Sequence, residues 1–316
     1  MRAPRTGAYS TEAGKVSAGR FSGMATVRSG SHRRSVMVTA HNISKPVMHS
    51  PILRSSAPRV LPLLAAAGLW LPATAGSFQI TVQNLAPANG TYLTPVWGGF
   101  HNGSFDLFDS GSAATAALER LAEDGTVNPL RADFAAAVPT GVDGVAGMAP
   151  IAPGASVSFT VSLNPMSAHT RFFSYASMII PSNDAFIGNG NPTAFQIFDL
   201  SGNQVLSSFM VSGANVWDAG TEMNDELPMN TAFFGQTTPN TGVAQGGVIA
   251  LHGGFNAPGT GGILDSAMFS AADFTQGGYQ VAQITITPVP EPEEWAVVGA
   301  AGLIGFALWR RRAMRA

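Results

Sequence analysis

The chain has 316 residues, of which 11% are charged and none is cysteine, so a disulfide framework and a thiolate metal site are excluded. The formal net charge is −2, but the basic and acidic residues lie in different parts of the chain. Residues 1–75 carry ten Lys and Arg and one acid, whereas residues 76–288 carry fifteen Asp and Glu against three Arg, a formal −12. A central region this acidic repels phosphate backbones, so no nucleic-acid partner is expected, and divalent cations or cationic surfaces are favoured.

The first 47 residues are basic, rich in Ser, Gly and Arg, and show no sustained hydrophobic period. Segments of this composition bury too little apolar surface to fold. We interpret residues 1–47 as a disordered leader, or as an over-long start of a protein that begins at Met37 or Met48. A functional basic arm is the alternative.

Residues 48–75 show the three parts of a secretory signal peptide. Two arginines precede the apolar run 60–71, and Ala73 and Ala75 place small residues at positions −3 and −1 of a cleavage site. We therefore predict export of the chain and cleavage after Ala75.

Residues 76–288 are predicted to form an all-β domain, an antiparallel β-sandwich with one short helix. Many short alternating segments separated by turn signals favour a sandwich over a fold of alternating strands and helices. The expected strands are 78–82, 93–100, 157–163, 172–180, 194–200, 205–211, 247–252 and 280–287. The expected helix, 113–124, follows a possible cap at Ser112 and stops at Gly125.

The end of the chain has an apolar run from Trp295 to Trp309, followed by Arg310, Arg311 and Arg312. The run has about 15 residues, fewer than the roughly 20 of a comfortable membrane span. Arginines at its end mark a cytoplasmic boundary. Physical reasoning therefore predicts a short C-terminal membrane anchor.

The same segment begins with Pro290, Glu291 and Pro292, and the order of motif, apolar helix and arginine cluster resembles the PEP-CTERM sorting signal of Gram-negative bacteria. The resemblance covers 289–312 and leaves 313–316 as a tail. It implies recognition by an exosortase-type membrane protease and transient anchoring in the inner membrane. Release to the cell surface or into an exopolysaccharide or biofilm matrix would follow.

Enzyme signatures are missing from the sequence. It contains no G-x-S-x-G elbow, no H-E-x-x-H, no Walker loop and no cysteine nucleophile. The histidines at positions 101, 169 and 252 lack ligand spacing and are interpreted as structural or surface residues. We therefore expect no enzyme, although a hydrolase with an unrecognised carboxylate site remains an alternative.

Two polar segments follow predicted strands and are suited to a hard cation. Asp184 comes after an apolar run, and Asp218 and Glu222 flank Gly220, which allows a sharp turn. Calcium takes six to eight oxygen ligands from carboxylates, carbonyls and water. The sequence therefore predicts calcium as the cofactor, bound by Asp184, Asp218 and Glu222; the alternative is that these residues only cap turns.

The acidic domain also resembles the spondin domain known from F-spondin and mindin, over roughly Ser77 to Pro288. The matching segments are Thr94 to His101, Gly111 to Gly125, Pro153-Gly154, Ala176 to Gly188 and Trp217 to Glu222. That family is an eight-stranded, C2-like β-sandwich with bound calcium, and its animal members act in matrix adhesion. The resemblance implies calcium-site roles for Asp184 and Asp218, and places Glu222 where the animal pattern has Asp.

The leading hypothesis is an exported, calcium-binding, spondin-like protein with an adhesive or structural role at the cell surface or in the matrix. The alternative is a carbohydrate-binding module for exopolysaccharide, with Tyr92, Trp97 and Trp217 as stacking faces.

Overall fold

The computed structural model describes residues 75–290 and 292–314. The predicted leader 1–47, the signal peptide 48–75 except its last residue, and Glu291 lie outside this part of the chain. The descriptions that follow concern the predicted all-β domain and the helix after it.

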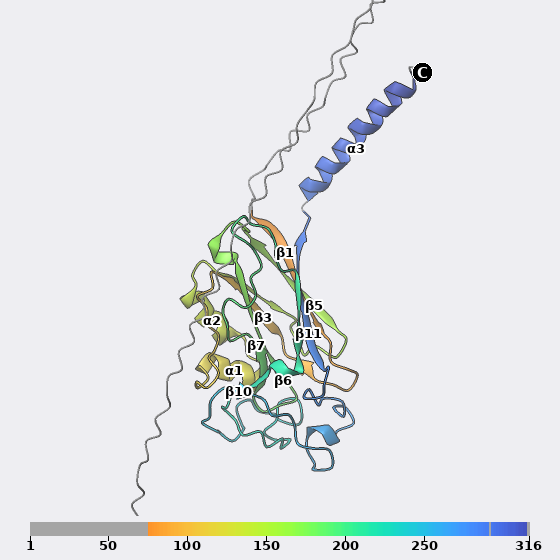
Figure 1. The fold of residues 1–316 in the computed structure, drawn as a ribbon. Helices are drawn as coiled ribbons and strands as arrows, with labels where there is room; N and C mark the ends of the chain where they lie inside the picture. Colours follow the sequence, from red (N-terminus) through yellow and green to blue (C-terminus); the bar gives the residue numbers. More distant parts are fainter. Residues whose placement is uncertain (1–74, 291, 315–316) are drawn as a thin grey trace, which may run out of the picture. The chain divides into compact units, whose positions relative to one another are not determined.

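The domain is built from two antiparallel sheets (Figure 1). The first sheet has the order β5 (Ser156–Leu163), β1 (Gly76–Asn84), β11 (Gln280–Val289) and β8 (Ser208–Ser212). The second has the order β10 (Ala250–Leu251), β9 (Val216–Asp218), β7 (Ala185–Gly188), β6 (Phe172–Ile180), β3 (Val96–His101) and β4 (Val142–Ala146), with β2 (Tyr92–Leu93) paired to β6. The predicted antiparallel β-sandwich is therefore confirmed.

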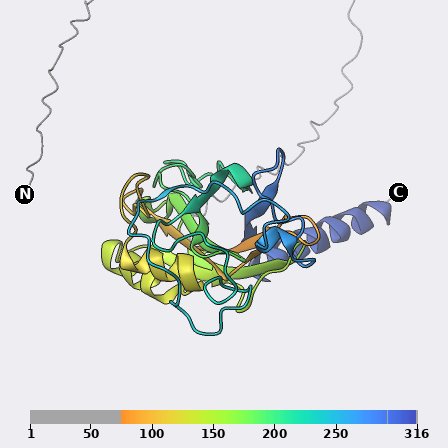
Figure 2. The same ribbon diagram turned by 90° about the horizontal axis from the view of Figure 1, so that it is seen from below.

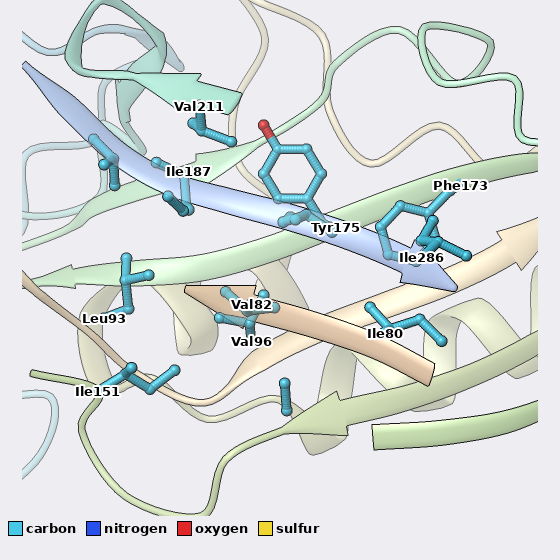
Figure 3. Packing of buried hydrophobic residues seen from close by; sticks show 14 of the residues in the cluster. Ile80, Val82, Leu93, Val96, Ile151, Phe173, Tyr175, Ile187, Val211 and Ile286 are labelled. Carbon is cyan, nitrogen blue, oxygen red and sulfur yellow. The ribbon is translucent and has the colours of Figure 1, made fainter. Parts of the chain in front are cut away.

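The main core lies between the two sheets. Side chains alternate along a strand, so the apolar positions of β1 and β11 face the same way. Ile80 of β1 is paired with Ile286 of β11, and both are fully buried. They share this core with Phe173 and Ile187 of the second sheet, and Figure 3 shows Ile286 beside Phe173. The alternation in the sequence thus correctly predicted which face of β1 is buried.

Two helices, α1 (Ala116–Asp124) and α2 (Asn128–Ala137), cover the outer face of the second sheet. Figures 1 and 2 both show them in yellow on the side away from β11. Leu118 of α1 and Phe134 of α2 share a core with Trp97 and Phe186 of this sheet. Strands β6 and β7 are covered on both faces, which explains their continuous apolar sequences.

Several predicted boundaries were wrong. Helix α1 is capped by Thr115, whose Oγ1 accepts a hydrogen bond from the backbone nitrogen of Leu118 at 3.2 Å, and not by Ser112. Gly125 ends the helix as predicted, with φ 66°.

The prediction of a single helix was also wrong, because the sequence analysis missed helix α2. It also missed strand β4. Residues 194–200 form isolated bridges and not a strand, and the short 3₁₀ helices are Ala168–Thr170, Gly213–Asn215 and Ile263–Asp265.

The C-terminal segment forms α3 (Pro292–Ala313), which includes Arg310, Arg311 and Arg312 in its last turn. The helix expected from the sequence is present. The membrane anchor predicted for it is not supported, because none of the helices in the described part of the chain has the length and apolar character that a membrane crossing requires.

Candidate metal centre

Asp184 and Asp218 lie at the same end of two neighbouring strands. Ala185 of β7 is paired with Asp218 of β9, so the turn before β7 meets the residues after β9. Ser182 closes this turn: its Oγ donates to the carbonyl of Ile179 at 2.6 Å and accepts from the nitrogen of Ala185 at 3.1 Å. Sheet pairing therefore brings together two acidic residues that are far apart in sequence.

The carboxylate of Asp184 is fully buried, and only one of its two oxygens accepts hydrogen bonds. Its Oδ2 accepts hydrogen bonds from the backbone nitrogens of Thr221 at 2.8 Å and Glu222 at 3.1 Å, and from Thr221 Oγ1 at 3.2 Å. Its Oδ1 is buried and has no hydrogen-bond partner. Burial, followed by the charge of Asp218, raises the pKa of Asp184 to about 6. A buried carboxylate oxygen without a donor destabilises the fold unless a cation compensates it.

Asp218 is oriented by a chain of hydrogen bonds. Its Oδ1 accepts from the nitrogen of Gly220, and its Oδ2 accepts from Asn224 Nδ2, both at 2.6 Å. Asn224 Oδ1 in turn lies 3.2 Å from His252 Nε2. Since the nitrogen of Gly254 donates to His252 Nδ1 at 3.0 Å, the imidazole carries its proton on Nε2 and donates to Asn224. Burial lowers the pKa of His252, which keeps it neutral.

Gly220 is required by the turn between Asp218 and Glu222. It has φ +68°, and a Cβ at this position would lie 2.7 Å from the backbone of Val248. Only glycine adopts this conformation without strain and also allows such a close approach. The sharp turn predicted at this residue is confirmed.

Glu222 also has one satisfied and one unsatisfied oxygen. Its side chain is 3% exposed, its Oε1 accepts from the nitrogen of Gly242 at 3.0 Å, and its Oε2 is buried without a partner. Burial, and next the charge of Glu123, raises the pKa of Glu222 to about 7. Gly242 packs so closely on this carboxylate that a Cβ at position 242 would overlap it.

A further carboxylate comes from the C-terminal end of α1, and the sequence analysis did not assign it. Glu123 is 3% exposed, its Oε2 has no partner, and burial is the largest cause of its raised pKa. Its neighbour Asp124 pairs with Arg120 and accepts from the nitrogen of Asn240 at 3.1 Å. Acids are unfavourable at the negative end of a helix dipole, so a cation here would stabilise both. Two consecutive acids in the last helical turn were the available signal.

We call Glu123, Asp184, Asp218 and Glu222 the carboxylate cluster. The three residues predicted as metal ligands thus lie in one region, joined by Glu123. Three of these four carboxylates keep a buried oxygen without a partner, and carboxylate oxygens are what calcium prefers. In the described part of the chain no three acidic or histidine side chains are already gathered tightly enough to hold a metal ion. The donor chemistry fits calcium, and binding would have to draw these side chains closer.

The aromatic residues proposed as a carbohydrate platform do not form one. Trp97 is fully buried, packs edge-on against Phe134 with ring centroids 5.3 Å apart, and donates from Nε1 to Asp143. Tyr92 packs against aromatic rings of the 233–269 segment, and Trp217 packs against Phe108. The stacking role predicted for Trp97 was wrong, because both faces of the second sheet are covered.

The comparison with curated proteins finds no match to this chain. A family model described as Spondin_N matches residues 79–230, a segment that runs from β1 past β9 and contains the whole carboxylate cluster. Residues 79–230 of this chain are therefore similar to the spondin N-terminal domain.

Proposed function

We propose that this protein is an exported, calcium-binding, spondin-like domain with an adhesive or structural role at the cell surface or in an exopolysaccharide matrix. The extracellular setting is supported by the family match over residues 79–230. The calcium site is supported by one observation above all: the buried, unpartnered oxygens of Glu123, Asp184 and Glu222 gather within one cluster.

Calcium would act as a structural clamp in this proposal. The cluster joins the turn before β7, the segment after β9 and the end of α1. Burial, and then the like charges of the cluster, raise the pKa values of Glu123, Asp184 and Glu222. A divalent cation would neutralise this repulsion and supply the missing partners. With the cation bound, the loops at this end of the sandwich would be held in one arrangement suited to contact with a partner.

The proposed role is not enzymatic. His252 donates to Asn224 and accepts from a backbone nitrogen, so both ring nitrogens are occupied. His101 is fully buried against Ser174, with Nε2 and Oγ 2.9 Å apart, and burial lowers its pKa to about 4. These contacts support a structural role for both histidines.

Export and sorting complete the proposal. Signal-peptide cleavage after Ala75 and recognition of Pro290, Glu291 and Pro292 by an exosortase-type protease both remain predictions from the sequence. The intact mass of the protein collected outside producing cells tests them, since each cleavage removes a defined mass. Recovery of an uncut chain would contradict both.

A calcium titration of the purified full-length chain by isothermal calorimetry tests the central claim. We expect saturable calcium binding that Asp184→Asn abolishes. The matched control is Asp133→Asn, which removes the same charge from an exposed position of α2 outside the cluster and is expected to bind calcium normally. Absence of binding by the unmodified chain, or equal binding by Asp184→Asn, would overturn the proposal.

A further inference from the structure

The outer face of the first sheet is polar and carries no charge. Strands β1, β5, β8 and β11 contain no Asp, Glu, Lys, Arg or His. Their inward positions are apolar apart from the buried Asn84, and their outward positions are hydroxyl and amide side chains. These outward residues, the hydroxyl-amide face, are Ser77, Gln79, Thr81, Gln83, Ser156, Ser158, Thr160, Ser162, Ser208, Gln283, Thr285 and Thr287, with Met210 and Val289 as apolar exceptions.

Strand register arranges these side chains in rows. Thr81 of β1 is paired with Ser158 of β5 on one side and with Thr285 of β11 on the other, and Thr285 is paired with Ser208 of β8. Neighbouring strands lie about 4.8 Å apart, and residues two apart along a strand are separated by about 6.8 Å. The face is therefore a regular grid of hydroxyl and amide groups across four strands. Figure 1 shows β1, β5 and β11 side by side.

Contacts within the grid fix some of its amides. Gln283 Nε2 donates to Ser208 Oγ at 3.0 Å, and Gln79 Nε2 donates to Ser158 Oγ at 3.4 Å. Hydroxyl and amide groups both donate and accept hydrogen bonds, so each retains capacity for a ligand. Groups that are already oriented lose less entropy when they bind.

A purely solvated face would be expected to carry charge. Residues 76–288 carry fifteen acidic and three basic side chains, and charged side chains on a surface maintain solubility. Residues 76–288 have a formal −12, yet none of this charge falls on the first sheet. The exclusion of charge from one whole sheet indicates a ligand that carries none.

The chemistry of the face also excludes other classes of partner. It has no cation for nucleic acid or a polyanionic glycan. Met210 and Val289 are too few apolar side chains for a protein interface or a lipid surface. We propose that the hydroxyl-amide face binds a neutral, hydroxyl-rich polysaccharide, whose hydroxyl groups match the grid as donors and acceptors. This inference does not depend on calcium.

Co-sedimentation of the full-length chain with two insoluble neutral glucans, microcrystalline cellulose and curdlan, tests it. We expect retention on at least one of them in EDTA, and none on polyanionic alginate beads. The double variant Thr81→Val and Thr285→Val removes two central hydroxyls, and retention should become about 30-fold weaker, because the two lost hydrogen bonds together contribute roughly 2 kcal/mol. Valine keeps the β-branched shape, so the sheet is expected to fold.

The matched control removes two exposed loop hydroxyls, Thr237→Val and Thr238→Val, and should bind like the unmodified chain. A second variant, Thr81→Lys, places a charge in the grid and should abolish retention. Thermal unfolding confirms that each variant folds. Lack of retention on both glucans, or equal retention by every variant, would overturn the proposal. Adsorption of the protein to ice without retention on glucan would also overturn the proposal, and would show that the hydroxyl-amide face binds ice.

Discussion

The carboxylate of Asp184 accepts a hydrogen bond from the backbone nitrogen of Thr221 at 2.8 Å, although 37 residues separate them in the sequence. This bond fixes the segment after β9 against the turn before β7. It occupies only Oδ2, and the buried Oδ1 on the same side chain has no partner. The same residue therefore organises the loops and leaves a site that a cation can complete.

Replacing Asp184 by Asn should abolish stabilisation by calcium while preserving the fold. The amide oxygen of Asn can still accept from the nitrogens of Thr221 and Glu222. Calcium at a hundred times its dissociation constant should stabilise the unmodified chain by about 2.7 kcal/mol and the variant by nothing. In EDTA the variant should be at least as stable as the unmodified chain, because it lacks a buried charge.

Differential scanning calorimetry with calcium and with EDTA measures both effects. Asp133→Asn serves as the control and should show the full calcium shift. A calcium shift that persists in Asp184→Asn would contradict this assignment.

Replacing Glu123 by Gln should weaken calcium binding about tenfold, because affinity depends on the number of charged ligands. Glu119→Gln makes the same change on the same helix, where the side chain is partly exposed, and should leave the affinity unchanged. Calorimetric titration separates the two variants. Equal affinities would remove Glu123 from the site and leave its unpartnered oxygen unexplained.

The metal-free protein should lose stability from the cluster as the pH rises. The pKa values of Asp184 and Glu222 are raised to about 6 and about 7 in the folded state, above the usual carboxylate range. The folded state therefore binds more protons than the unfolded state, and this contribution to stability is lost as the pH rises from about 4 through 7.

The buried histidines His101 and His252 act in the opposite direction, because their pKa values are lowered. The measurement is therefore a difference between the unmodified chain and the double variant Asp184→Asn and Glu222→Gln, which share both histidines. In EDTA, raising the pH from 5.5 to 7.5 should destabilise the unmodified chain relative to the double variant. Parallel pH profiles of the two melting temperatures would contradict the shifted carboxylates.

Replacing Asn224 by Leu should disorient Asp218, since Asn224 Nδ2 donates to Asp218 Oδ2 at 2.6 Å. Loss of this donor should cost about 1–3 kcal/mol of unfolding free energy and weaken calcium binding about tenfold. Urea unfolding and a calcium titration report the two effects. Met223→Leu, at an exposed neighbouring position, should change neither. Normal calcium affinity in Asn224→Leu would show that calcium binding does not require the hydrogen bond from Asn224 to Asp218.

Replacing Trp97 by Ala should destabilise the fold by about 3–5 kcal/mol, because it leaves a cavity in the core between the second sheet and the helices. Leu251→Ala, where the side chain is 58% exposed, should cost within about 0.5 kcal/mol. Urea unfolding distinguishes them. A small cost for Trp97→Ala would contradict its burial.

The sequence by itself determined the class of the fold and much of its strand content. Strict alternation has only one physical meaning, a strand with one covered face, so β1 and β5 were predictable. The long apolar run of β6 was also predicted at its observed bounds, 172–180. The end of helix α1 at Gly125 and the sharp turn at Gly220 were also predictable from the sequence, and both glycines have positive φ.

The tertiary structure decided the position of helix α2 and the burial of Trp97, which no local sequence pattern indicates. Helix α2 has only two buried apolar side chains, Leu130 and Phe134, so its sequence lacks a strong helical period, and packing against the sheet defines it. Trp97 could be offered as a stacking face in the carbohydrate-binding alternative because no local signal shows that α1 and α2 cover its strand.

The candidate site shows the same division. Asp184, Asp218 and Glu222 were identified from residue type and position beside strands. Glu123 could be added only once helix packing had placed it against Thr221 and Glu222. Residue type determines which atoms can bind a cation, and residue type can be read directly from the sequence. Which atoms meet, and which remain without a partner, depends on contacts between distant segments, and only the folded chain decides that.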